Sequence, residues 1–378
     1  MGKRTIVMLI CLIMLVGLFA ACSNGAQDTQ ASSSETAEAS PVTESSDTQT
    51  SEAASGELPI LGAGIFAATD NFNTYIGKGI TEACSGMYET SIQDGQNDQA
   101  TQMNQVDTML AKGAAGIALS VVDLTAAPTI IQKCKDAGNV PVVFFNKEIT
   151  DQSVIDSYDK LYMVTSTGGG YGAEIEGQMV ADYWKANPGM DKNGDGKLQV
   201  IVIMGALEHP ACTPRAQYAL STLTDNGINY ELLEEQPANW DTAQAKEKMD
   251  AWVSKYGDTI ECVIAANDAE ALGALQSVEA AGFNANGKGS EKYIPIIGID
   301  ALPEMLDKIE SGEIIGSVLQ DAKSQGKTVV KIIDNLVKGK DVSEGIDYKL
   351  EMPAKAFRIP YTAITIDNLD VAEANYEQ

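Results

Sequence analysis

From residue 58 onward, short aliphatic runs alternate with longer amphipathic segments. The aliphatic runs predict strands at 60–66, 116–119, 140–145, 200–204, 262–265 and 294–299. The amphipathic segments predict helices at 75–87, 98–112, 126–137, 172–187, 215–226, 241–256, 269–281 and 302–311. This alternation indicates parallel sheets covered by helices. The chain is long enough for two such doubly wound α/β lobes, and the run at 162–167 is expected to cross between them.

Polar side chains follow most of these predicted strands. They are, in chain order, Asp70 with Phe72, Asn146, His209 with Arg215, Asn267 with Asp268, and Asp300, while Trp240 precedes the helix predicted at 241–256. Ligands of open α/β sheets bind at the carboxyl ends of the strands, so these side chains are expected to share one edge. At any single position, Asn or Asp could instead be a helix cap or a turn former. Five strand ends and two aromatic rings favour a binding site.

The chemistry of this set suits a sugar. Asp, Asn and Arg side chains offer the paired hydrogen bonds that sugar hydroxyls need. Phe72 and Trp240 could cover the two apolar faces of a pyranose ring. A hydrolase using two carboxylates, such as Asp70 and Asp300, stays open on composition, although nothing in the sequence marks a proton donor. We therefore expect a binding protein and not an enzyme.

Residues 191–199 match the first nine positions of an EF-hand-type calcium loop. The predicted oxygen ligands are Asp191, Asn193, Asp195, the backbone carbonyl of Lys197, and Gln199. Val202 occupies the twelfth position, where the motif has a bidentate Glu. Glu261 begins another predicted strand at the same edge as Gln199 and is expected to supply the missing carboxylate. Calcium would then lie at the edge opposite the ligand groups and have a structural role.

The N-terminus predicts export. Two basic residues precede an apolar run at 6–21, and two alanines directly precede Cys22. This pattern predicts a lipoprotein signal over 1–21 and a lipid on the thiol of Cys22, with an ordinary secretory signal or an uncleaved anchor as alternatives. Residues 22–57 are rich in Ser, Thr, Ala, Gln and Glu, which predicts a disordered tether.

Net charge, cysteine spacing and histidine count each argue against a class of function. The formal net charge of −27 argues against a nucleic-acid partner, whose phosphates would repel the chain. The four cysteines beyond the N-terminal segment show no C-x-x-C spacing and are expected to be free thiols: Cys84, Cys134, Cys212 and Cys262. His209 is the single histidine, and the sequence has no G-x-S-x-G motif, which argues against a serine-type triad.

Eight sequence blocks resemble the bacterial periplasmic galactose/glucose-binding proteins of ABC-type sugar uptake. The blocks are TDNF at 69–72, QNDQ at 96–99, VPVVFFNKE at 140–148, DSYDK at 156–160, the calcium loop at 191–199, WDTAQAK at 240–246, AND at 266–268 and GIDALP at 298–303. The resemblance implies a type I periplasmic binding protein with two lobes and a three-segment hinge. The implied lobes are 58–164 with 320–360, and 165–319 with 361–378.

The resemblance also implies residue roles. The implied sugar-binding residues are Asp70, Phe72, Asn146, His209, Arg215, Trp240, Asn267, Asp300 and Gln320. Phe72 and Trp240 would sandwich the ring, and Asp70 would accept either orientation of the C4 hydroxyl of D-glucose or D-galactose. The implied calcium ligands are those named above, Glu261 included.

Two positions depart from the family. An aspartate two positions after the cleft histidine is Ala211 here, and an asparagine is replaced by Gln320. Losing a charged acceptor near the reducing end of the sugar would weaken binding by about 1.5–3 kcal/mol if nothing replaces it. Alternatively, Ala211 makes room for a substituent at C1, so the expected ligand is a hexose or a C1-substituted hexoside.

The expected protein is a monomeric, lipid-anchored receptor outside the cytoplasm, whose closed form is recognised by an ABC permease in the membrane. The alternative is a sensor that presents the closed form to a chemoreceptor or histidine kinase without uptake. The predicted signal and tether at the N-terminus argue against a DNA-binding repressor with a similar core.

Overall fold

One parallel sheet forms the centre of the first lobe in the computed structural model, which describes residues 57–285 and 287–376. In spatial order its strands are β11 (Leu350–Glu351), β12 (Ala356–Ile359), β5 (Leu161–Ser166), β4 (Val142–Phe145), β3 (Gly116–Leu119), β1 (Ile60–Ile65) and β2 (Glu89–Asp94). Only the β11–β12 pair among these strands is antiparallel.

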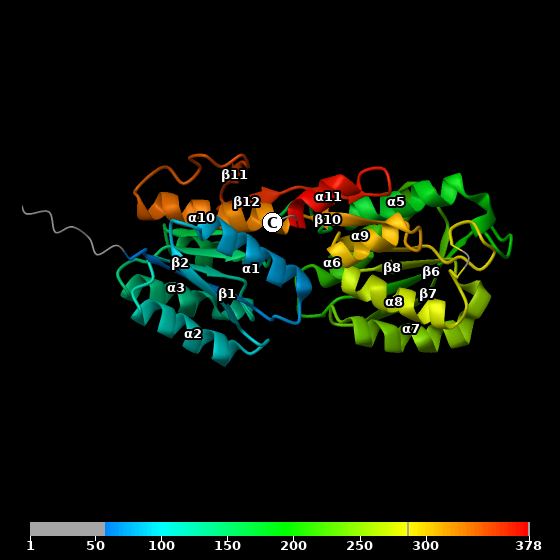
Figure 1. Ribbon diagram of the computed structural model, residues 1–378, viewed down its shortest axis with the longest axis horizontal. Helices are drawn as coiled ribbons and strands as arrows, with labels where there is room; N and C mark the ends of the chain where they lie inside the picture. Colours follow the sequence, from blue (N-terminus) through cyan, green and yellow to red (C-terminus); the bar gives the residue numbers. More distant parts are fainter. Residues whose placement is uncertain (1–56, 286, 377–378) are drawn as a thin grey trace, which may run out of the picture. The chain divides into compact units, whose positions relative to one another are not determined.

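A second sheet forms the centre of the other lobe (Figure 1). In spatial order its strands are β13 (Tyr361–Ile364), β10 (Gly316–Gln320), β9 (Ile296–Asp300), β8 (Cys262–Ala265), β6 (Leu198–Met204) and β7 (Tyr230–Pro237). The β10–β13 pair is antiparallel and the other pairs are parallel. The predicted fold class, two α/β lobes with parallel sheets, is confirmed.

Helices cover both faces of the first sheet. One face packs against α1 (Asn71–Cys84) and α10 (Ala322–Val337), and the other against α2 (Gln99–Ala111) and α3 (Ala127–Asp136). Successive residues of β4 alternate between these layers, because side chains of a strand point to opposite faces. Val143 and Phe145 face α1 and α10, whereas Val142 and Phe144 face α2 and α3.

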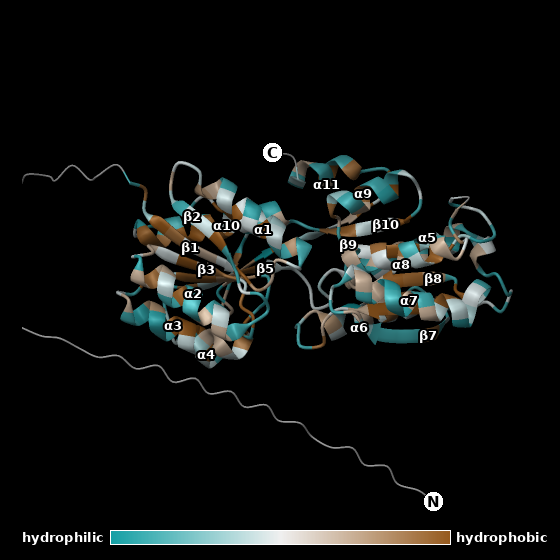
Figure 2. Ribbon diagram, turned by 60° about the horizontal axis from the view of Figure 1, so that its bottom comes forward, coloured by the Kyte–Doolittle hydropathy of each residue, from teal (hydrophilic) through white to brown (hydrophobic). Residues whose placement is uncertain are grey.

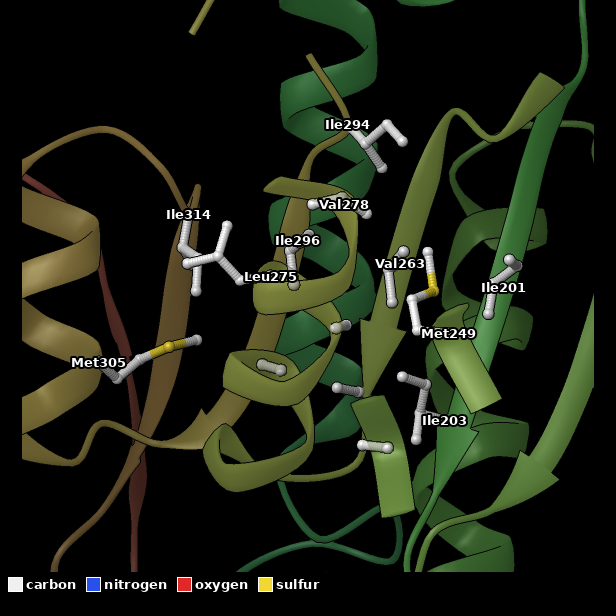
Figure 3. Close-up of a cluster of buried hydrophobic side chains, with 14 of the residues drawn as sticks. Ile201, Ile203, Met249, Val263, Leu275, Val278, Ile294, Ile296, Met305 and Ile314 are labelled. Atoms are coloured by element: carbon white, nitrogen blue, oxygen red, sulfur yellow. The ribbon is translucent and has the colours of Figure 1, made fainter. Parts of the chain in front are cut away.

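The second sheet is covered in the same way. One face packs against α7 (Thr242–Tyr256), α8 (Asp268–Ala280), α9 (Pro303–Glu310) and α11 (Leu369–Tyr376), and the other against α5 (Ala173–Ala186) and α6 (Cys212–Asp225). Figure 3 shows the first of these layers, where Met249 and Leu275 meet the aliphatic side chains of three strands. Hydropathy follows this layering, since the inner strands are hydrophobic and the edge strand β7 is hydrophilic (Figure 2).

Short elements complete the described residues. They are helix α4 (Gln152–Asp156) and 3-10 turns at Leu124–Ala126, Pro188–Met190 and Gly257–Thr259. None of the helices in 57–285 and 287–376 is long and apolar enough to span a membrane. The predicted signal, the lipidated Cys22 and nearly all of the predicted tether lie outside these residues.

The chain passes between the two sheets three times. The passages follow β5, connect β10 to α10, and connect β12 to β13. The run predicted to be a crossing at 162–167 is therefore mostly strand β5, which pairs with β4 and β12. The first passage begins only after Ser166.

All four cysteines of the two lobes are buried free thiols, as predicted. They are Cys84, Cys134, Cys212 and Cys262. Burial raises the pKa of Cys84 and Cys212 to about 11 and that of Cys134 to about 12. Thiols that stay protonated are poor nucleophiles, so these positions serve packing.

Removing the Phe144 ring should strongly destabilise the first lobe. Phe144 is fully buried between the sheet and helices α2 and α3. We expect Phe144→Ala to lower the free energy of unfolding by about 3–5 kcal/mol, measured by urea denaturation. Leu232→Ala on the edge strand β7 is the control, because Leu232 is 37% exposed. Equal losses from both variants would contradict this account of the core.

Candidate ligand-binding site

A cavity at the carboxyl ends of the strands is lined by both lobes. Its lining residues are Asp70, Phe72, Asn146, Tyr171, His209, Ala211, Arg215, Trp240, Asn267, Asp300, Gln320 and Tyr361. All nine side chains predicted to bind the ligand are among them. The structure therefore brings together residues that the sequence separates by up to 250 positions.

The first lobe supplies Asp70, Phe72 and Asn146. Asp70 caps helix α1, because its Oδ1 accepts a hydrogen bond from the backbone N–H of Asn73 at 2.9 Å. Its second oxygen is left for the cavity. Phe72 follows in the first turn of the same helix and is buried. Asn146 comes directly after β4 with a positive φ of 67°, which turns the chain at the cavity.

His209 connects the lobes as a neutral ring. Burial lowers the pKa of His209 well below its ordinary value, and the nearby Lys147 and Arg215 charges lower it further. Its Nδ1 accepts a hydrogen bond from the backbone N–H of Ala211 at 3.2 Å, so the hydrogen of the neutral ring is on Nε2. Nε2 lies 3.3 Å from Oδ1 of Asn146 and donates to it. This contact joins the two walls of the cavity.

Arg215 is the buried cation of the second lobe's wall. It lies in α6, which begins three residues before the predicted start of this helix. Its guanidinium donates to four oxygens: the carbonyls of Tyr171 and Ala266, Oε1 of Gln320, and the hydroxyl of Tyr361. These bonds use four of the five N–H groups and fix the planar fork, so one N–H is left. Because Gln320 spends its oxygen on Arg215, its amide N–H₂ is the group left for the cavity.

Trp240 forms the aromatic wall of the second lobe. It precedes α7 with a positive φ of 63°, and its ring meets that of His209 edge to face at 5.2 Å. Gly205, directly after β6, makes room for it, since a Cβ there would lie 2.0 Å from the indole ring. Any side chain larger than hydrogen at this position would displace the indole.

Buried acids lie on and behind the cavity wall. Asp300 at the end of β9 lines it, and Glu176, Asp268 and Glu270 are buried behind it. Burial raises the pKa of Glu270 to about 8 and that of Asp268 to about 7, and raises those of Asp300 and Glu176 well above their ordinary values. The Arg215 charge lowers all four pKa values, but only partly offsets burial.

Sequence reasoning missed Tyr171 and Tyr361. Both lie where the chain passes between the sheets, Tyr171 before α5 and Tyr361 at the start of β13. The ring of Tyr361 also packs at Gly172, where a Cβ would lie 3.0 Å from it. Aromatic residues beside the glycines at 168–172 and after Pro360 were the available signal.

The predicted calcium ligands gather at the opposite edge of the second sheet. Glu261 spans the loop, because its Oε1 accepts from the backbone N–H of Lys192 at 2.6 Å and its Oε2 from that of Gln199 at 3.0 Å. Asp191 accepts from the backbone N–H groups of Gly194, Asp195 and Gly196. The loop is thus wrapped around its own carboxylates.

These residues fit a hard cation. Oε1 of Gln199 is buried, and no donor from residues 57–285 or 287–376 reaches it. Burial raises the pKa of Glu261, and the charge of Asp191 raises it further, so two carboxylates repel each other here. Across the described chain, no three His, Cys, Asp or Glu side chains are arranged as a metal cluster by themselves. The set instead mixes carboxylates with amide and backbone oxygens, as calcium loops do.

Comparison with known proteins places the chain in a family. Residues 65–341 match the periplasmic binding protein domain. The chain belongs to the periplasmic binding protein family, and it is a binding protein and not an enzyme. A D-galactose/methyl-galactoside binding periplasmic protein of Haemophilus influenzae, MglB, is 41% identical over 312 residues, covering 82% of this chain and 90% of the relative.

Other relatives share the fold. A xylitol-binding protein of Mycolicibacterium smegmatis is 29% identical, covering 78% of this chain and 75% of that protein. The crystal structure of an ABC transporter solute binding protein from Bacillus halodurans with bound myo-inositol has a TM-score of 0.67. It is 26% identical and covers 85% of this chain and all of that one.

The buried acids predict a pH dependence of stability. The pKa of Glu270 is about 8 in the folded chain against an ordinary 4.5. A carboxyl with a raised folded pKa stabilises the fold most when protonated, and this contribution is lost as pH rises from the ordinary pKa to the folded one. Between about pH 4.5 and 8, the free energy of unfolding of the parent should therefore fall by up to about 1.4 kcal/mol per pH unit because of Glu270. Glu270→Gln should not show this fall, because its side chain does not titrate.

Urea denaturation of the parent and Glu270→Gln at pH 5, 6, 7 and 8 measures this effect. The difference in unfolding free energy between the two proteins cancels the titration of His209 and of the surface acids. The variant should gain stability relative to the parent as pH rises. A difference that stays constant across this range would show that Glu270 has an ordinary pKa.

Proposed function

We propose that the protein is the substrate-binding lipoprotein of an ABC-type sugar uptake system and binds a hexose in the cavity between its lobes. The ligand would be D-galactose, D-glucose or a C1-substituted hexoside. The observation that carries the proposal is the lining of one cavity by acids, amides, a guanidinium and aromatic rings from both lobes, Phe72 and Trp240 among them. The galactose-binding name of the 41% identical relative supports the same ligand class.

Each wall would take a different part of the sugar. Phe72 and Trp240 would cover the two faces of the ring, where its C–H groups are apolar. The free oxygen of Asp70, the amides of Asn267 and Gln320, and Arg215 would bind hydroxyls. Oδ1 of Asn267 accepts a hydrogen bond from the backbone N–H of Glu270, so its N–H₂ group would be the one that donates to the ligand.

Ala211 would set the difference between free hexose and glycoside. It lines the cavity with a methyl group beside Arg215 and His209. A small apolar side chain at this point offers no acceptor to a free anomeric hydroxyl but leaves room for a substituent. A methyl galactoside would therefore lose less affinity here than in a site with an acid at that position.

Isothermal titration calorimetry with D-galactose, D-glucose and their methyl glycosides tests the proposal. We expect binding of at least one, with a rise in melting temperature, because a ligand that binds only the folded state stabilises it. Trp240→Ala should weaken binding at least about tenfold through loss of the aromatic wall. Trp184→Ala, on α5 outside the cavity lining, should leave affinity unchanged. No binding of any of these sugars would reject the hexose assignment.

We also propose a structural calcium ion on Asp191, Asn193, Asp195, the Lys197 carbonyl, Gln199 and Glu261. The buried, donorless Oε1 of Gln199 and the adjacent acids support it. The ion would neutralise these carboxylates and link the loop to the start of β8, where Glu261 precedes the strand.

Chelation tests the calcium proposal. Calcium at about 100 times its dissociation constant should stabilise the protein by about 2.7 kcal/mol relative to the protein in EGTA. Glu261→Gln removes one negative charge without changing side-chain size and should remove most of this gain. Thermal melts with calcium, magnesium or EGTA measure it, and identical melting temperatures in all three for the parent would contradict the site.

The receptor would act as a monomer outside the cytoplasm, anchored by a lipid on Cys22, and its closed form would be recognised by a permease. The alternative is a sensor whose closed form is read by a chemoreceptor or kinase. Uptake of labelled sugar by cells with and without the gene separates these two roles.

A further inference from the structure

The first turn of helix α8 carries two buried acids that do not line the cavity. Asp268 and Glu270 are fully buried, and neither is among the cavity-lining residues. Neither forms a salt bridge within the described residues. Burying an unpaired acid is costly, and an apolar side chain would fill the same space without that cost. The hydrogen bonds that these two acids accept from neighbouring loops therefore indicate their role.

Glu270 holds the loop that carries Trp240. Its Oε1 accepts a hydrogen bond from the backbone N–H of Trp240 at 2.8 Å. Asn239 and Trp240 both have positive φ values, 57° and 63°, which non-glycine residues adopt only at a cost. The hydrogen bond to Glu270 holds this backbone in place. Gly205 leaves space for the indole ring of Trp240.

Asp268 holds the turn that carries Asp300. Its Oδ2 accepts from the backbone N–H of Leu302 at 2.7 Å, and its Oδ1 accepts from the Ser317 hydroxyl at 2.7 Å. The oxygen of Ser317 in turn accepts from the backbone N–H of Ala301 at 3.1 Å. Asp300 and Ala301 have positive φ values of 127° and 52°, so this turn too has a costly backbone conformation. The hydrogen bonds from Ala301 and Leu302 hold it in place.

One short helical turn thus reaches two walls of the same cavity. Asn267 lines the cavity itself and caps α8, with Asp268 and Glu270 one and three residues later. Helical geometry gives the two acids different directions, so one reaches the β7–α7 loop and the other the β9–α9 turn. Their mutual placement is as rigid as the helix.

We propose that Asp268 and Glu270 are positioning residues that set the Trp240 indole and the Asp300 carboxyl relative to each other, and that ligand affinity depends on them although neither touches the ligand. This inference rests on the proposed function of the cavity. It makes ligand affinity depend on two side chains that do not line the cavity.

The test compares two substitutions of Glu270. Glu270→Gln keeps an oxygen that can accept from the Trp240 N–H, whereas Glu270→Leu fills the space without an acceptor. For D-galactose measured by calorimetry, we expect Glu270→Leu to bind at least about tenfold more weakly than the parent, since a buried N–H is left unpaired. Glu270→Gln should stay within about threefold of the parent because the acceptor is restored.

A second readout does not require any sugar. In a Trp184→Phe/Trp252→Phe background, Trp240 is the remaining tryptophan. It is 9% exposed, so acrylamide should quench it weakly in the parent. Glu270→Leu should raise the quenching constant in ligand-free protein, and Glu270→Gln should not. This readout decides the inference even if the parent binds none of the sugars, a result that would reject only the proposed function.

Leu275→Ala is the control for general destabilisation. Leu275 lies in the same helix, is buried in the hydrophobic core and does not line the cavity. It should lower the melting temperature while leaving affinity and quenching at parental values. The proposal is overturned if Leu275→Ala weakens binding as much as Glu270→Leu does, or if Glu270→Leu changes neither affinity nor quenching.

Discussion

The hydrogen bonds of the Arg215 guanidinium are the interaction on which the binding site depends. They join α6 to the end of β8 through the Ala266 carbonyl, to the end of β10 through Gln320, and to two inter-sheet passages through Tyr171 and Tyr361. Four separate parts of the chain therefore meet at one rigid, permanently charged group. The same charge lowers the pKa values of the acids buried nearby, but burial outweighs it and those pKa values stay raised.

Six of the buried inner strands could be predicted, whereas the edge strands could not. The buried strand β10 was missed as well, because its sequence GSVLQ holds only two aliphatic residues. The aliphatic runs of β1, β3, β4, β6, β8 and β9 are buried on both faces, so the sequence shows them directly. The edge strands β2 and β7 are half exposed, and their polar sequences ETSIQD and YELLEEQP show no aliphatic run. Residues 162–167 lie mostly in strand β5 and not in the expected crossing. A strand and an extended connection have similar sequences, so the sequence does not distinguish them.

The same division applies to the site. The side chains that follow strands were predictable, because strand direction alone brings them to one edge. Tyr171 and Tyr361 lie on the passages between lobes, and their direction is set by tertiary contacts with Arg215 and Gly172. Asp268 and Glu270 look like ordinary acids in the first turn of a helix, which favours them by its dipole. Only the packing of α8 against the β7–α7 loop and the β9–α9 turn shows that they are buried.

The buried acids have a consequence for calorimetry. At neutral pH Glu270 keeps its proton in the folded chain, because burial raises its pKa to about 8. The unfolded chain, where the pKa returns to near 4.5, must release that proton to the solution. The apparent enthalpy of unfolding will then include the heat with which the buffer takes up the proton. Scans in phosphate and in Tris will accordingly differ for the same molecule at the same pH.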